Sequence, residues 1–258
     1  MARRNSSRAM PGVARFHVPS ARPDVRTVSL SADEAHHLRH VLRLDVGAEV
    51  IAFDGAGHEW RARVGEAGKS GVQLALEEAS TAVAEPVVNV TLGIGWLKGD
   101  QMDAVVRDAT MLGASAIAPF IWEYVSVPAS VWRRAGAIER WQRVAVSSAK
   151  QCHRAVVPGI EAVRSLSQLI DDSMDRTLVV AVEPSAENDL GGRFTKTVKR
   201  PPRSTALALI GPEGGWSSSE ITMLKDRGAE LVQLGPRTLR AETAPTVLLT
   251  VLWTMWGW

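Results

Sequence analysis

The chain has 258 residues, 45% of them hydrophobic and 22% charged, and its formal net charge is only +2. This balance excludes a disordered chain, and the length suits one large domain or two small ones. The single cysteine, Cys152, excludes both a disulfide framework and a cysteine-rich zinc site. The single cysteine also fits a reducing cytoplasm, where we expect the protein. No run of about 18 apolar residues exists, so no membrane span is expected.

Residues 1–14 are basic and rich in small polar side chains, which predicts a flexible tail. From residue 15 to 82 the expected elements are short. A helix begins at Ser31, and its apolar face carries Ala35, Leu38, Val41 and Leu42. Three strands separated by glycine-rich turns follow, at Glu49–Phe53, Glu59–Val64 and Val72–Leu76. Short strands of this kind are typical of a small β-barrel.

A linker at 80–85 separates this region from a second one, in which longer apolar strands alternate with helices. Apolar strands are expected at 87–97, 114–121, 178–182, 206–210 and 230–234. Helices are expected between and after them, at 99–112, 138–149, 217–227 and 242–256. The alternation predicts an α/β fold with a parallel sheet that is covered on both faces. Ligands of such sheets bind beyond the carboxyl ends of the strands.

Three loops follow expected strand ends. The richest reads GPEGGW at 211–216, and the other two begin at Glu183 and Gly235. Glycines let a backbone approach a ligand closely, but the loop lacks the ending of a P-loop, and Glu213 would repel a triphosphate. A cation that carries adenosine without phosphates fits these loops better. The alternative is a tight turn followed by a capping box, Ser217–Glu220, that opens the next helix.

The third loop, at 235–243, contains two arginines, Arg237 and Arg240. Arginine forks suit phosphate oxygens or uracil carbonyls. The alternative is an ion pair that fixes the loop, either Arg240 with Glu242 or Arg237 with Glu213. Both interpretations can hold at once.

Several segments share a pattern with a known family. The loops GPEGGW at 211–216 and LGPRTLRAETA at 234–244 occur together with ERWQRVAVSSAKQCHR at 139–154, and HHLRHVLRL at 36–44 and KGDQMDAVVRDATMLGA at 98–114 match in place and order. The chain thereby resembles the 16S ribosomal RNA uridine-N3 methyltransferases of the SPOUT superfamily. The resemblance implies a PUA-like RNA-binding β-barrel at 15–82 and a methyltransferase domain at 86–258 with a carboxyl-terminal trefoil knot. It also implies S-adenosyl-L-methionine as donor, a homodimer, and N3 of a uridine in 16S rRNA of the small ribosomal subunit as the methylated atom.

The resemblance also indicates site residues. The cofactor contacts are expected from Glu183, Pro184, Ile210, Gly211, Glu213, Gly214, Gly215, Leu234, Gly235, Leu239, Arg240, Thr243 and Ala244. The catalytic candidates are Arg240 or Arg237, to stabilise charge on the uracil carbonyls, and Glu242, while the base is not identified. RNA contacts are expected from Arg15, His37, Arg39, Arg43, Gln151 and Arg154. No metal site is predicted, because the histidines at 36, 37 and 40 lack a further ligand.

The sequence departs from the family's usual pattern at Met111, Tyr124 and Lys150. Trp141 is expected in the core. The last helix is unusually apolar, and we favour burial against a second subunit over core packing for Leu248, Leu249, Leu252, Trp253, Trp256 and Trp258. The alternatives for the function are a SPOUT enzyme with another RNA target and a catalytically silent RNA-binding protein of the same fold.

Overall fold

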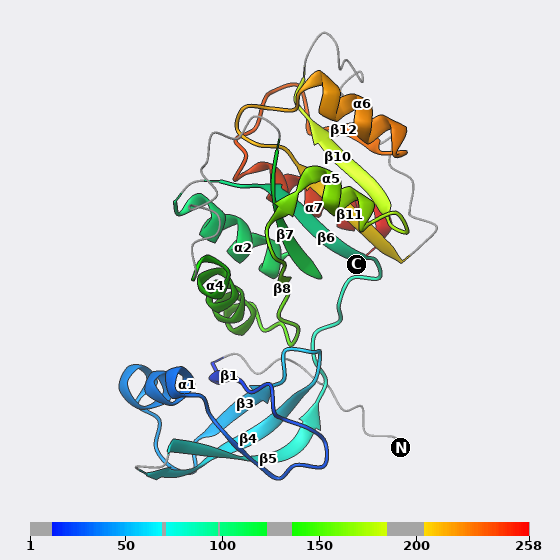
Figure 1. The fold of residues 1–258 in the computed structure, drawn as a ribbon. Helices are drawn as coiled ribbons and strands as arrows, with labels where there is room; N and C mark the ends of the chain where they lie inside the picture. Colours follow the sequence, from blue (N-terminus) through cyan, green and yellow to red (C-terminus); the bar gives the residue numbers. More distant parts are fainter. Residues whose placement is uncertain (1–11, 69–70, 98, 123–135, 185–203, 258) are drawn as a thin grey trace, which may run out of the picture. The chain divides into compact units, whose positions relative to one another are not determined.

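The computed structural model describes residues 12–68, 71–97, 99–122, 136–184 and 204–257 (Figure 1). By their contacts the residues form two compact units. The first unit holds the chain up to Ala84 together with Val146–Val157, and the second holds Glu85–Ala145 together with Pro158–Trp258. The division therefore falls inside helix α4 (Ala137–Gln151).

A five-stranded sheet forms the first unit. Its strands are β1 (Arg15–His17), β2 (Thr27–Ser29), β3 (Glu49–Phe53), β4 (Glu59–Gly68) and β5 (Gly71–Ser80), in the order β1-β3-β4-β5-β2. Only the β1–β3 pair is parallel. In β5 the side chains of Val72, Leu74 and Leu76 are buried and alternate with exposed ones, as a half-buried strand requires. The three predicted strands are confirmed, and β4 and β5 run several residues further than expected.

The helix expected from Ser31 begins where predicted, but it continues from an α-helix into a π-helix. Ser31 is the N-cap of α1 (Ala32–His36), and its hydroxyl accepts the N–H of Glu34. A π-helix, η1 (His37–Leu42), follows, in which each N–H reaches the carbonyl five residues back. The wider turn shifts the phase of the apolar face, so Leu38 is buried but Val41 and Leu42 are exposed. The apolar face that the sequence predicts is therefore buried at Ala35 and Leu38 but exposed at Val41 and Leu42.

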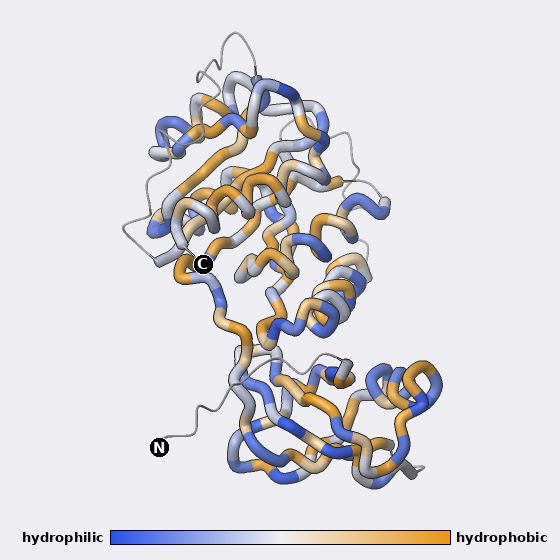
Figure 2. Tube along the Cα trace, turned by 180° about the vertical axis from the view of Figure 1, so that it is seen from behind, coloured by the Kyte–Doolittle hydropathy of each residue, from blue (hydrophilic) through white to orange (hydrophobic). Residues whose placement is uncertain are grey.

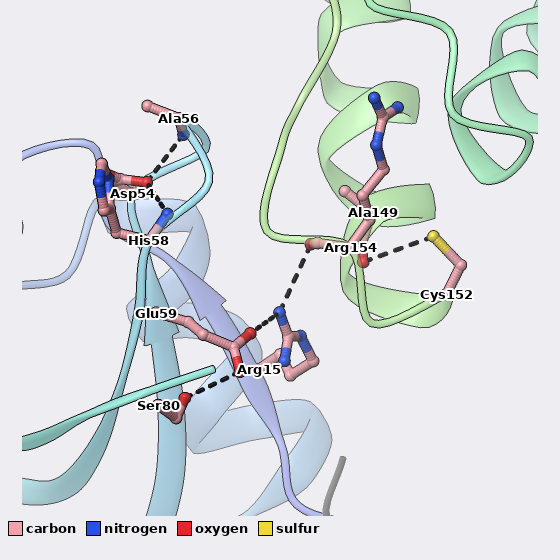
Figure 3. Close-up of polar contacts among 9 residues, drawn as sticks. All are labelled: Arg15, Asp54, Ala56, His58, Glu59, Ser80, Ala149, Cys152 and Arg154. Atoms are coloured by element: carbon pink, nitrogen blue, oxygen red, sulfur yellow. Dashed lines mark hydrogen bonds and ion pairs between the residues drawn. The ribbon is translucent and has the colours of Figure 1, made fainter. Parts of the chain in front are cut away.

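Residues 146–157 pack on the sheet of the first unit. Ala149 and Ala155 share a core cluster with Phe53, and the Lys150 ammonium lies 2.8 Å from a carboxylate oxygen of Glu34. Figure 3 shows the guanidinium of Arg15 between two partners, because one of its nitrogens donates both to Glu59, at 2.8 Å, and to the carbonyl of Arg154, at 3.4 Å. Nothing in the sequence pattern separates this segment from the region that surrounds it in the chain.

The second unit is built on a parallel sheet. Its strands are β6 (Asn89–Gly95), β7 (Ala116–Ile121), β8 (Gly159–Ile160), β9 (Arg164–Ser165), β10 (Thr177–Val182), β11 (Thr205–Ile210) and β12 (Glu230–Gln233). The order is β12-β10-β11-β6-β7-β8, with β9 also on β7, and every pair is parallel. The predicted strands are confirmed; β8 and β9 are too short to leave a periodicity in the sequence.

Helices cover both faces of this sheet. Side chains of α5 (Leu166–Asp171) and α6 (Ser218–Asp226) share one core cluster with β7, β10, β11 and β12. Two further helices, α2 (Gln101–Met111) and α7 (Ala244–Trp256), pack on one another, and α7 also packs on β11 (Figure 1). Successive side chains of β10 are all buried from Leu178 to Val182, which requires cover on both sides.

The last helix is buried within a single chain. Five of the apolar side chains expected to need a second subunit are already in the core, namely Leu248, Leu249, Leu252, Trp253 and Trp256. The indole N–H of Trp253 donates to the carbonyl of Leu112. These five therefore follow the core-packing alternative, and Trp258 lies outside the described residues. The prediction for Trp141 is confirmed, because its ring is buried against Trp96.

Two further expectations depend partly on parts of the chain that the structure does not describe. The trefoil knot stays a prediction, because residues 185–203 of the domain in which it is expected lie outside the described residues. Tyr124 also lies outside them. In the described part of the chain, none of the helices combines the length and the apolar character that a membrane span needs.

Candidate active site

The three loops singled out in the sequence line one cavity. Strands β12, β10 and β11 are neighbours and run parallel, so their carboxyl ends meet at the same edge of the sheet. A cavity of about 720 Å³ opens there, and residues after each of the three strands line it. The start of α2 contributes Gln101, and the start of α7 contributes Ala244.

The charges on the cavity wall favour a cation without phosphates. Among the described residues, the charged members of the lining are three carboxylates, those of Glu183, Glu213 and Glu242, and two guanidinium groups, those of Arg237 and Arg240. The described part of the wall thus carries one more carboxylate than guanidinium groups, which suits a positively charged ligand better than a polyphosphate. Backbone of Gly211, Gly214 and Gly215 completes the lining on the β11 side.

Trp216 fixes the shape of the loop after β11. Its indole N–H donates to the carbonyl of Ala181 in β10 at 2.8 Å, and its ring stacks on Phe120 with centroids 5.9 Å apart. A Cβ on Gly211 would come within 2.8 Å of this indole, so only glycine fits there. Gly215 has a φ of +76°, which glycine adopts readily. The capping box is confirmed, because Ser217 Oγ accepts the N–H of Glu220 and the Glu220 carboxylate accepts the N–H of Ser217.

A chain of contacts surrounds Glu242 in the loop after β12. One carboxylate oxygen lies 3.8 Å from the Arg240 guanidinium, and the other accepts a hydrogen bond from the Gln101 side chain at 3.4 Å. Glu242 is largely covered, with 22% of its side chain exposed, whereas Arg240 is 85% exposed. The Arg240–Glu242 ion pair left open by the sequence is therefore formed, and the guanidinium still faces solvent.

Most of the residues expected at the cofactor line the cavity. They are Glu183, Pro184, Ile210, Gly211, Glu213, Gly214, Gly215, Leu234, Leu239, Arg240 and Ala244. The catalytic candidates Arg237 and Glu242 line the cavity too. Gly235 and Thr243 belong to the same loop but are not part of the lining. The sequence interpretation missed Gln101 and Trp216. The signal for Gln101 was available, because it follows β6, whose carboxyl end lies at the same edge of the sheet.

The six RNA-contact candidates all lie in the first unit and differ in accessibility. Arg43 and Gln151 are exposed, and His37 and Arg39 are half-buried. Arg39 donates to the carbonyl of Gly71 at 2.7 Å. Burial lowers the pKa of His37, and the nearby Lys150 ammonium lowers it further. The side chains of Arg15 and Arg154 are buried, so they are poorly placed to meet RNA on the surface.

Comparison with known proteins defines the class and then the family. The family described as "RNA methyltransferase domain" matches residues 84–253, and the family "RNA methyltransferase PUA domain" matches residues 30–77. The chain is thus an RNA methyltransferase. It is 34% identical to the ribosomal RNA small subunit methyltransferase E of Synechocystis sp., over 86% of this chain and 71% of that protein. The protein of that name from Bacillus subtilis is 30% identical over 88% of this chain and 89% of its own length.

A solved structure supports the same family assignment. The ribosomal RNA small subunit methyltransferase E of Neisseria gonorrhoeae, bound to S-adenosyl methionine, superposes with a TM-score of 0.83 at 28% identity and covers 95% of this chain and 98% of its own. The chain belongs to the ribosomal RNA small subunit methyltransferase E family, which confirms the resemblance found in the sequence.

Proposed function

We propose that this chain transfers the methyl group of S-adenosyl-L-methionine to N3 of one uridine in 16S rRNA of the small ribosomal subunit. The observation that carries the proposal is one cavity at the carboxyl ends of β10, β11 and β12, whose described lining holds three carboxylates and two arginines. Membership of the family supports small-subunit rRNA as the substrate, and the Neisseria gonorrhoeae relative supports the donor.

The residues present fit this donor. When bound, S-adenosyl-L-methionine supplies an electrophilic methyl group on a positively charged sulfur. Glu183 and Glu213 bring negative charge to the wall, which suits a sulfonium cation and hydroxyl donors. A Cβ on Gly214 would meet no atom within 4 Å, so this glycine leaves open space at the lining. Leu234 and Leu239 offer apolar surface for a base.

Arg240 is the residue best placed to act on the uracil. The imide at N3 must lose a proton, and the resulting negative charge spreads onto the carbonyl oxygens. A guanidinium aimed at these oxygens stabilises that charge. Arg240 lines the cavity and is exposed, and Glu242 holds it from one side. Glu242 either accepts the proton or keeps Arg240 in position.

The substrate assignment is tested by nucleoside mass spectrometry. Small subunits that lack 16S rRNA uridine-N3 methylation are incubated with the protein and with methyl-labelled S-adenosyl-L-methionine, and the rRNA is digested to nucleosides. We expect label in 3-methyluridine only. Label in another nucleoside would reject the N3 assignment in favour of another RNA target. No label in any nucleoside, with the cofactor not bound, would favour a catalytically silent protein.

The role of Arg240 is tested by Arg240→Ala with Arg237→Ala as the matched variant. Loss of a group that stabilises charge in the transition state should lower kcat by about 10²- to 10³-fold. Calorimetry with S-adenosyl-L-methionine measures separately the contribution of Arg240 to cofactor binding, so that the loss in kcat is read at saturating cofactor. An Arg240→Ala enzyme with full turnover would remove the assignment, and a loss confined to Arg237→Ala would transfer it to that arginine.

We further propose that the protein works as a homodimer in the cytoplasm. The family resemblance supports the dimer, and a single cysteine suits a reducing compartment. Light scattering on the eluted protein measures the mass directly, and a single-chain mass at micromolar concentration would reject the dimer.

A further inference from the structure

Gln101 connects the start of helix α2 to the loop that carries the two arginines of the cavity. It is the first residue of α2, and its half-buried side chain lines the cavity. The side-chain amide donates to one carboxylate oxygen of Glu242 at 3.4 Å, and the other oxygen lies 3.8 Å from the Arg240 guanidinium. The Glu242 carboxylate is therefore contacted by an amide from α2 on one oxygen and by a guanidinium of its own loop on the other.

The packing of α2 on α7 brings Gln101 to Glu242. At the other end of α2, the carbonyl of Leu112 accepts the indole N–H of Trp253 in α7. The two hydrogen bonds are eleven residues apart in both segments, from 101 to 112 and from 242 to 253. Eleven residues make about three turns of an α-helix, so the two bonds lie on the same side of α2. The register of α2 on α7 thus sets which residue of α2 reaches the loop.

The first turn of α2 has further contacts that fix its backbone. The Arg140 guanidinium, from α4, donates to the carboxylate of Asp100 at 3.0 Å and also to that of Asp103. Figure 2 shows hydrophobic and hydrophilic residues interleaved along the helices of the second unit. In α2 the hydrophobic ones are buried, namely Met102, Val105, Val106 and Ala109. The amide of Gln101 is therefore presented from a fixed helix, which positions a partner more precisely than a loop does.

The chemistry of the three side chains suits a positioning role for the amide. An amide donates a hydrogen bond but adds no charge, so the negative charge of Glu242 stays available to Arg240. The Arg240 side chain is 85% exposed, and an exposed arginine has many accessible rotamers. A carboxylate that is itself held in place restricts these rotamers, because the guanidinium then has a fixed partner.

We propose that Gln101 is a positioning residue for methyl transfer: it fixes the Glu242 carboxylate, which in turn holds the Arg240 guanidinium towards the uracil. The proposal rests on the proposed function in taking Arg240 as the group that stabilises charge on the uracil carbonyls. It assigns Glu242 to the positioning of Arg240 rather than to the acceptance of the proton. A displacement of about 1 Å at a reacting geometry costs up to about 10²-fold in rate, so a contact away from the reacting atoms affects kcat.

The test measures the total label that the full-length protein transfers from methyl-labelled S-adenosyl-L-methionine to the RNA of small subunits. Gln101→Met keeps an unbranched side chain of similar size and removes the amide. At saturating cofactor it should lower kcat about tenfold. It should lower kcat/KM for small subunits by the same factor, because the lost contact acts in the transition state and not in substrate binding. A purely structural role would not produce this division between kcat and KM.

A double-mutant cycle then locates the effect. Gln101→Met is combined with Glu242→Ala and, separately, with Arg240→Ala. If Gln101 acts through these two residues, its replacement should cause no further loss of kcat in either background. An effect that is independent of them would multiply the loss by the same factor in every background.

Gln142→Met is the matched control. Gln142 is also a half-buried glutamine of the second unit, and it lies outside the cavity lining. Its side chain donates to the carbonyl of Pro158 at 3.3 Å and accepts the N–H of Ile160 at 3.2 Å. Gln142→Met should therefore lower the unfolding free energy in urea titrations and leave kcat unchanged.

Three results would overturn the proposal. They are an unchanged kcat in Gln101→Met, a further tenfold loss in the Glu242→Ala or Arg240→Ala background, and an equal loss of kcat in Gln142→Met. Failure of the proposed function looks different. A wrong uridine-N3 assignment moves the label to another nucleoside without changing its total, and a wrong role for Arg240 leaves Arg240→Ala with full turnover.

Discussion

Trp216 connects the loop after β11 to the end of strand β10 through one hydrogen bond. Its N–H holds the carbonyl of Ala181, two residues before Glu183, while its ring fills the space that Gly211 leaves. The variant Trp216→Phe keeps an aromatic ring on Phe120 but removes the N–H. Since such a bond contributes about 0.5–1.5 kcal/mol, we expect S-adenosyl-L-methionine to bind about two- to twelvefold more weakly by calorimetry.

A matched control for this prediction is Trp141→Phe, which changes a buried tryptophan of the same unit outside the cavity lining. It should lower stability without changing the dissociation constant. Equal weakening of cofactor binding in both variants would mean that the indole N–H of Trp216 has no specific role.

The buried pair of Arg15 and Glu59 has a structural role. Their side chains are 6% and 9% exposed, and Ser80 donates to the second oxygen of Glu59 at 2.8 Å. Removal of one partner leaves an uncompensated buried charge, so Glu59→Ala should lower the unfolding free energy by about 3–5 kcal/mol in urea titrations. The double variant Arg15→Met/Glu59→Met should lose less and keep its affinity for 16S rRNA. If a stable double variant bound 16S rRNA more weakly, Arg15 would be an RNA contact, as the sequence analysis expects.

His17 makes the stability of the first unit depend on pH. Burial lowers the pKa of its ring; Glu34 and Asp54 raise the pKa, and Lys150 lowers it. The unfolded chain therefore binds more protons than the folded one between the lowered pKa and the ordinary value of about 6.5. The unfolding free energy should fall as the pH drops below that value. His17→Gln should flatten this dependence between pH 7 and pH 5, and an unchanged slope would contradict the assignment.

At the scale of elements, α7 decides between two interpretations that the sequence left open. Leu252 is fully buried within one chain, so Leu252→Ala should lower the unfolding free energy by about 2–5 kcal/mol. If α7 belongs to the core, this loss is the same at every protein concentration. A loss that shrinks as the concentration rises would mean that the helix is instead buried between subunits.

Elements with a long, regular pattern could be predicted from the sequence, and those set by tertiary contacts could not. The strands Leu178–Val182 and Ala206–Ile210 were expected almost to the residue, since continuous apolar runs identify buried strands. The π-helix was missed because a helical wheel assumes a regular α-helical turn. The apolar face of α7 could not reveal its partner, because core and subunit contacts require the same side chains.

At the scale of the whole chain, the position of the cavity could be predicted from the sequence more fully than the boundaries of the two compact units. Strand-end loops converge by the geometry of a parallel sheet, so three motifs sufficed to predict one site. Residues 146–157 join the first unit through Ala149, Lys150 and Arg154, and contacts between segments so distant in sequence leave no local signal. The same distance explains why Arg15 could not be recognised as buried.

The most direct test of the account is a crystal structure of the protein with bound S-adenosyl-L-homocysteine, the demethylated cofactor. We predict that its adenosyl group lies against Leu234 and Leu239, within hydrogen-bonding distance of backbone after both β11 and β12. Electron density for the ligand at any other place, with the cavity at 183, 211 and 235 empty, would contradict the account.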